Sequence, residues 1–218
     1  MEMKTLILDF DGTLADSRHS IVETIKITAK ELGLPEAKES DIINLIGLPL
    51  KDTLKNAMYI SDEKILDKAT AIYRTKYNET GIEMVKLFPN VKKTLEILYN
   101  RGHTITIASN KGRNGLTLLL TKLSIAQYIS LTLGEQDVQN KKPAPDMVLR
   151  ILEETKSLPE ETLVVGDTIY DIEMGQLANC FTCGVSYGNH SKKRLKEQKA
   201  DYIVDDFIEI INIMQQKK

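Results

Sequence analysis

Apolar residues are distributed differently in two parts of the chain. From about Arg18 to Gly81 they recur at helical spacing, and no strand-like run occurs. The apolar positions of the first such helix are Ile21, Ile25, Ala29 and Leu32. From Val91 onward, short apolar runs alternate with helical stretches, a pattern typical of βαβ units and a parallel sheet. We therefore predict a small helical domain inserted into a larger α/β domain.

The predicted strands are short apolar segments. The first, residues 4–8, is nearly continuous in its apolar character, as expected for a strand buried on both faces of a parallel sheet. Further strands are predicted at 104–108, 131–133, 162–165, 181–185 and 203–204, with helices at 91–101, 116–123, 146–154, 171–179 and 207–214. This order predicts an α/β fold with a doubly wound, mainly parallel, Rossmann-like sheet. The expected core is 1–15 with 82–218, and the expected all-helical insert is 16–81.

Composition and charge narrow the class of protein. The chain has 218 residues, 42% apolar and 28% charged, which is ordinary for a globular protein. Its 29 basic and 31 acidic residues give no reason to expect a nucleic-acid or anionic-membrane partner. No apolar run is long enough to span a bilayer, and Met1-Glu2-Met3-Lys4 leads directly into the first predicted strand. We expect a cytoplasmic protein, a monomer or a weak homodimer.

The only cysteines, Cys180 and Cys183, form a lone C-x-x-C pair. A structural zinc site would need a second pair of ligands, and none is present nearby. The pair leads into an apolar stretch, so we expect buried thiols beside a strand rather than a redox dithiol.

Acidic residues follow two of the predicted strands. Asp9 and Asp11 come after the first strand, where residues two apart share a side. Asp167 and Asp171 follow the strand at 162–165. Because ligands bind beyond the carboxyl ends of parallel strands, these four carboxylates are expected at one edge of the sheet, where Mg²⁺ would relieve their repulsion. The alternative for Asp9 and Asp11 is an ordinary acidic turn.

Two further polar segments lie at the same edge of the predicted sheet. Ser109-Asn110-Lys111 follows the strand at 104–108 and could hold an anion, although it could equally be a plain helix cap. Lys142 precedes Pro143, which constrains the direction of the backbone. A lysine held there suits a phosphoryl oxygen, and the alternative is a surface lysine.

Together these segments resemble the four motifs of the haloacid dehalogenase-like superfamily, in order and in spacing. The matching residues are Asp9-Phe10-Asp11-Gly12-Thr13, Ser109-Asn110, Lys142-Pro143, and Gly166-Asp167 with Asp171. The resemblance covers essentially the whole chain and places the helical insert where the family has its cap. Asp16-Ser17 and Ile46-Gly47-Leu48-Pro49-Leu50 make the chain most similar to the phosphoglycolate phosphatase type.

Two other branches of the superfamily fit less well. Dehalogenases lack the second aspartate of the first motif, so Asp11 argues against halide displacement. The β-phosphoglucomutase branch is similar to this chain but carries a His where Ile21 stands and an Arg where Leu50 stands, and His19 is displaced by two residues. Mutase activity is therefore not expected.

The resemblance implies roles for individual residues. Asp9 would be the nucleophile that forms an aspartyl-phosphate, and Asp11 the general acid and then the general base. Asp9, the backbone carbonyl of Asp11, and Asp167 would bind Mg²⁺, with Asp171 as a further carboxylate. Ser109 and Lys142 would bind the non-bridging phosphoryl oxygens. The expected substrate-binding positions are Thr13, Asp16, Asn110 and Gly47.

The implied function is a Mg²⁺-dependent phosphatase that hydrolyses a small phosphate monoester, phosphoglycolate-like, with the cap closing over the substrate. The alternatives are an inorganic pyrophosphatase or nucleotidase on the same scaffold, and a phosphometabolite-binding module without turnover. The expected partner is a small phosphorylated metabolite.

Overall fold

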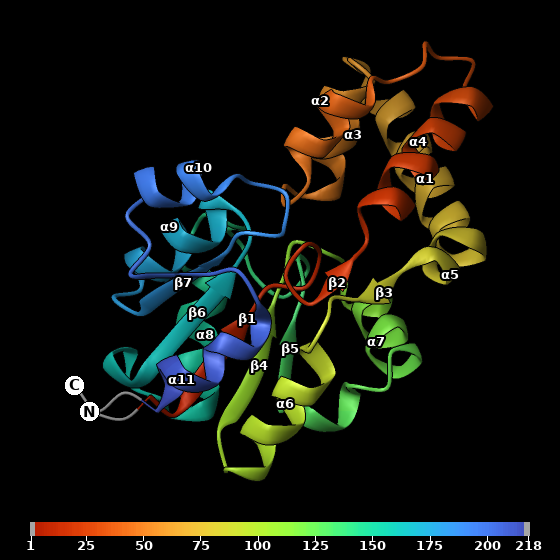
Figure 1. Cartoon of the computed structure of the whole chain (residues 1–218). Coiled ribbons are helices and arrows are strands. Elements are labelled where there is room, and N and C mark those ends of the chain that lie inside the picture. Colours follow the sequence, from red (N-terminus) through yellow and green to blue (C-terminus); the bar gives the residue numbers. More distant parts are fainter. Residues whose placement is uncertain (1–2, 216–218) are drawn as a thin grey trace.

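The computed structural model describes residues 3–215, which form a central sheet with helices on both faces (Figure 1). The sheet has six strands in the order β5-β4-β1-β6-β7-β8, and every neighbouring pair is parallel. The strands are β1 (Thr5–Leu8), β4 (Thr104–Ala108), β5 (Leu131–Leu133), β6 (Thr162–Gly166), β7 (Phe181–Val185) and β8 (Tyr202–Val204). The predicted α/β class and parallel sheet are confirmed.

Alternate residues of β1 enter different hydrophobic clusters, as expected for a strand covered on both faces. Leu6 and Leu8 belong to one cluster and Ile7 to the other. Helices α6 (Val91–Asn100), α7 (Arg113–Lys122) and α11 (Ile210–Met214) contribute to the first, and α8 (Asp146–Thr155) and α9 (Ile169–Leu177) to the second. The short elements are α10 (Lys192–Glu197), η2 (Ala126–Tyr128), η3 (Pro159–Glu161) and η4 (Phe207–Glu209).

The strand order creates a crevice beside β1. After β1 the chain builds β4 and β5 on one side, and then builds β6, β7 and β8 on the other. The connections that follow β1 and β6 therefore lead in opposite directions, which leaves the carboxyl ends of these two strands open to a ligand. Asp9 follows β1 directly, and Asp167 follows β6 directly.

A run of helices lies between the two segments that connect it to the core (Figure 1). It comprises α1 (Arg18–Glu31), α2 (Glu39–Leu45), α3 (Leu50–Ala57), α4 (Glu63–Lys76), the π-helix η1 (Tyr77–Gly81) and α5 (Ile82–Met84). The connecting segments are the short strands β2 (Ala15–Asp16) and β3 (Lys86–Leu87), which pair antiparallel. We propose that this segment acts as the cap domain, with its helical end at Met84 rather than at residue 81.

Both cysteines are buried free thiols, as expected from the sequence. Burial raises the pKa of the Cys180 thiol to about 12. Among residues 3–215, none of the helices has the length and apolar character needed to cross a bilayer.

Candidate active site

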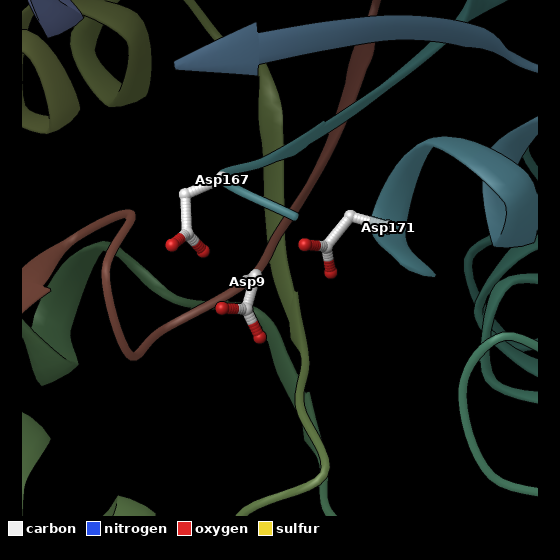
Figure 2. A group of neighbouring side chains, drawn as sticks. All are labelled: Asp9, Asp167 and Asp171. Carbon is white, nitrogen blue, oxygen red and sulfur yellow. The ribbon is translucent and has the colours of Figure 1, made fainter. Parts of the chain in front are cut away.

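Three buried aspartates meet at the crevice between β1 and β6. Asp9 comes from the end of β1, Asp167 from the end of β6, and Asp171 from the first turn of α9. One carboxylate oxygen of each lies within 4.8 Å of the others. Figure 2 shows Asp9 between Asp167 and Asp171, which approach it from two different segments. Residues more than 150 positions apart in sequence are thus brought together by the strand order.

Lys142 is the cation that this group of aspartates contacts directly. Its Nζ atom lies 2.6 Å from Asp9 Oδ1 and 2.6 Å from Asp171 Oδ1, and its side chain is only 2% exposed. The second oxygen of Asp171 accepts hydrogen bonds from the backbone and hydroxyl of Thr168 and so caps α9. Three carboxylates facing one ammonium leave two negative charges when all three carboxylates are ionised.

The environment changes how readily these groups ionise. Burial, reinforced by Asp171 and opposed by Lys142, raises the pKa of Asp9 to about 7. Burial and the neighbouring Asp9 carboxylate also raise the pKa of Asp167 well above its usual range. Burial by itself would lower the pKa of Lys142, but Asp171 and Asp9 outweigh it and raise that pKa. The protein alone therefore does not fully compensate the negative charge of this site.

The donor set fits Mg²⁺. This hard cation prefers carboxylate oxygens, and a divalent ion would balance the two uncompensated charges. Lys142 contacts one carboxylate oxygen of Asp171 and Thr168 the other, whereas Lys142 contacts Asp9 through Oδ1. The donors to Asp167 are neutral, so Asp9 and Asp167 are the better candidates to hold the ion. The Asp11 side chain is not part of the group of three aspartates, so the sequence-based expectation of four converging carboxylates holds for three.

Asp167 is held in place by neutral donors. Its Oδ2 atom accepts hydrogen bonds from the backbone and side-chain amides of Asn189 at 2.7 and 2.8 Å, and its Oδ1 atom accepts one from Thr13 Oγ1 at 3.3 Å. Gly12 passes so close that a Cβ atom there would lie 2.2 Å from Asp167 Oδ2, and its φ of +87° favours glycine. Neutral donors fix the orientation of this carboxylate without neutralising it.

Asp11 faces a different cation. Lys111 Nζ lies 3.2 and 3.3 Å from the two carboxylate oxygens of Asp11, and 3.0 Å from the hydroxyl of Tyr77 in the π-helix. Burial would lower the pKa of Lys111, but Asp11 and Tyr77 outweigh it, so the pKa is raised and the ammonium persists. The sequence contained Lys111 inside a recognised motif but gave no signal of this pairing.

Asp9 and Asp11 line one cavity of about 90 Å³ between the core and the helical segment. Ser109 and Asn110 also line it, with the Asn110 amide donating to the Gly47 carbonyl at 2.9 Å. Gly47 lines the same cavity from the α2–α3 loop. Four of the predicted catalytic and substrate-binding residues thus surround one space with Asp9.

Thr13 and Asp16 do not line this cavity. Thr13 is buried behind Asp167, where its carbonyl also accepts the hydroxyl of Tyr187. Asp16 is exposed and lines a separate surface pocket beside Gly12 and Asn189. The structure therefore gives Thr13 a supporting position and places Asp16 outside the site.

The polar composition of Asn189 to Lys199 predicts a solvated helix face, and this is wrong at the start of the stretch. The backbone N–H of Asn189 donates a hydrogen bond to Asp167. His190 is 2% exposed, and its Nδ1 atom accepts a hydrogen bond from the backbone N–H of Ile169. Burial lowers the pKa of His190 to about 4. Only α10 behaves as expected, and polar composition alone could not distinguish these two environments.

The doubly wound sheet places Asp9 and Asp167 at its central crevice, an arrangement of buried carboxylates that suits metal-assisted hydrolysis. Residues 6–185 match the family of haloacid dehalogenase-like hydrolases, and the chain belongs to that family. It is a phosphoglycolate phosphatase-like hydrolase of that superfamily and a phosphatase. The resemblance inferred from the motifs is confirmed.

Similar proteins cover the chain almost completely. The pyrophosphatase PpaX of Oceanobacillus iheyensis is 33% identical, and the alignment spans 98% of each chain. The phosphoglycolate phosphatase of Aquifex aeolicus is 30% identical over 97% of each. The crystal structure of a predicted phosphoglycolate phosphatase from Haemophilus somnus matches with a TM-score of 0.91 at 28% identity, covering 99% of each chain.

Proposed function

We propose that this chain is a Mg²⁺-dependent phosphatase that hydrolyses a small phosphate monoester through an aspartyl-phosphate on Asp9. The observation that carries the proposal is the position of Asp9, which lines the substrate cavity and lies against Asp167 and Lys142. A carboxylate nucleophile next to a cation site and a buried ammonium is suited to phosphoryl transfer, where positioning and charge neutralisation dominate.

In the first step an Asp9 carboxylate oxygen attacks phosphorus, and the bond from phosphorus to the leaving oxygen breaks. Asp11 lines the same cavity and enters this step protonated. It gives that proton to the leaving oxygen, so the leaving group departs as an alcohol and Asp11 becomes the carboxylate that Lys111 contacts. In the second step Asp11, now a carboxylate, accepts a proton from a water molecule whose oxygen attacks phosphorus. The Asp9–phosphorus linkage then breaks and inorganic phosphate leaves.

The surrounding residues bind and orient the phosphoryl group. Ser109 and Lys142 would hold its non-bridging oxygens, and Asp9, the Asp11 carbonyl and Asp167 would hold Mg²⁺, with Asp171 fixing Lys142. When bound, Mg²⁺ supplies positive charge that offsets the phosphoryl oxygens facing these carboxylates. Residues of the helical segment line the cavity, and closure of that segment over a bound substrate would limit access of bulk water.

The test is phosphate release from p-nitrophenyl phosphate with and without Mg²⁺. We expect release that requires Mg²⁺ and is abolished in Asp9→Asn. The matched control is Asp52→Asn, which makes the same change at an exposed position of α3 and should leave turnover unchanged. Normal turnover by Asp9→Asn would remove Asp9 as the nucleophile. Tight ligand binding without release under any metal would favour a binding module.

A second candidate is inorganic pyrophosphatase activity, favoured by the name of the 33% identical relative. A panel of phosphorylated metabolites that includes pyrophosphate and nucleoside monophosphates separates the candidates by kcat/KM.

A further inference from the structure

The cavity beside Asp9 has two chemically different walls. The core contributes its polar and charged residues, including Ser109, Asn110 and Lys111. The helical segment contributes mainly aliphatic side chains, namely Ile21, Ile25, Ile46, Leu48 and Leu50. It also contributes Tyr73 and Thr53, and the Thr53 hydroxyl already donates to backbone carbonyls of its own segment. The leaving group of a bound phosphate ester would face this aliphatic wall, because the phosphoryl group lies against Asp9.

Among the described residues, no lysine or arginine of the helical segment lines this cavity. The basic side chains close in sequence to lining residues are directed elsewhere. Arg18 donates to the Gly188 carbonyl at 2.7 Å, and Lys51 pairs with Asp67. Arg74 pairs with Glu135 at 3.2 Å. Within residues 3–215, the cap therefore places no lysine or arginine against a leaving group in this cavity.

The cations supplied by the core are also engaged. Lys111 faces Asp11, and Lys142 bridges two aspartates. A neighbouring cavity of about 430 Å³ contains Arg74 and Arg113, and Arg113 pairs with Asp137. Within this cavity, as the described residues line it, an anionic leaving group would thus lose its hydration without gaining a positive partner that is not already paired, which is unfavourable.

We propose that this site selects phosphate monoesters whose leaving group is small and uncharged, and that Leu50 helps to exclude anionic leaving groups. The cavity of about 90 Å³ beside Asp9 suits a small leaving group, and its aliphatic wall disfavours a charged one. The proposal rests on the proposed phosphatase function. It separates this chain from the relatives named for pyrophosphate and phosphoglycolate, which both have anionic leaving groups.

The direct test compares 2-hydroxyethyl phosphate with phosphoglycolate on the wild-type protein with Mg²⁺. The two esters are close in size. The first carries a hydroxymethyl group at the position where phosphoglycolate carries a carboxylate. We expect kcat/KM to favour the uncharged ester by at least about tenfold, the effect of one missing charge-assisted hydrogen bond. Equal or better hydrolysis of phosphoglycolate or pyrophosphate overturns the proposal. Failure to hydrolyse any ester refutes the proposed function instead.

The second test changes the aliphatic wall. Leu50→Arg should raise kcat/KM for phosphoglycolate relative to the uncharged ester by about tenfold, because it supplies the missing cation. Leu50→Gln has similar length without charge, and Ile65→Arg adds the same charge at a site that is 40% exposed and away from the cavity. Neither should change the ratio. An unchanged ratio in a folded Leu50→Arg protein refutes the role of Leu50, and the wild-type comparison stands even if that variant does not fold.

Discussion

Replacement of Lys142 by Met should destabilise the protein strongly and in a pH-dependent way. The ammonium of Lys142 contacts Asp9 and Asp171 at 2.6 Å, and all three side chains are less than 10% exposed. Removing one partner of a buried ion pair leaves a buried charge without compensation, which costs about 3–5 kcal/mol. In a domain of this size that loss corresponds to a fall in Tm of roughly 10 °C.

The pH dependence follows from the pKa of Asp9. This pKa is raised from 3.8 to about 7, so the folded state retains a proton that the unfolded state has already lost. Ionisation of Asp9 therefore lowers stability as the pH rises from the ordinary value through the raised one. Without Lys142 the pKa of Asp9 should rise further, so the stability difference between wild type and variant should grow with pH.

The assay is urea unfolding followed by circular dichroism, since the chain has no tryptophan. Measurements at about pH 5 and pH 8, without metal, should show the larger loss at the higher pH. Lys141→Met is the matched control, because Lys141 is partly exposed and its ammonium pairs with Glu135 at 3.4 Å. A loss below about 1 kcal/mol at both pH values, in the range of a surface ion pair, would refute the reasoning.

Two further predictions concern the metal ligands. Saturating Mg²⁺ should raise the Tm more at about pH 8 than at pH 5.5, because protons compete with the ion at Asp9 and Asp167, whose pKa values are raised; equal shifts would contradict this. Gly12→Ala should abolish the Mg²⁺-induced shift in differential scanning fluorimetry, since its Cβ would lie 2.2 Å from Asp167 Oδ2. Gly33→Ala, also at positive φ but with no atom within 4 Å, should keep that shift.

The sheet was predictable because its strands carry strong local patterns. The strands at 104–108, 131–133 and 181–185 have the predicted bounds, each being a short apolar run between polar turns. The strands β2 and β3 were missed because two residues are too few to show a period. These two strands are the connections between the core and the helical segment, and they meet only because the chain folds back on itself.

The site was predictable where each residue directly follows a strand. Asp9 and Asp167 were found in this way, and Lys142 was found from its motif. The partners that orient them were not. Asn189 reaches Asp167 from a polar segment that looked solvated, and Tyr77 reaches Lys111 from the helical segment. Such pairings depend on how distant elements pack, which no local pattern encodes.

The covalent state of Asp9 during turnover tests the account most directly. The protein is mixed with a hydrolysed ester and Mg²⁺, quenched in acid, reduced with borohydride and digested for mass spectrometry of the peptide that contains Asp9. Borohydride reduces an acyl phosphate to the alcohol. We therefore expect homoserine at position 9 when the ester is present and not when it is left out. A model acyl phosphate reduced in parallel is the control for the reduction. Unmodified Asp9 in a reaction that releases phosphate would then contradict the assignment of Asp9 as the nucleophile.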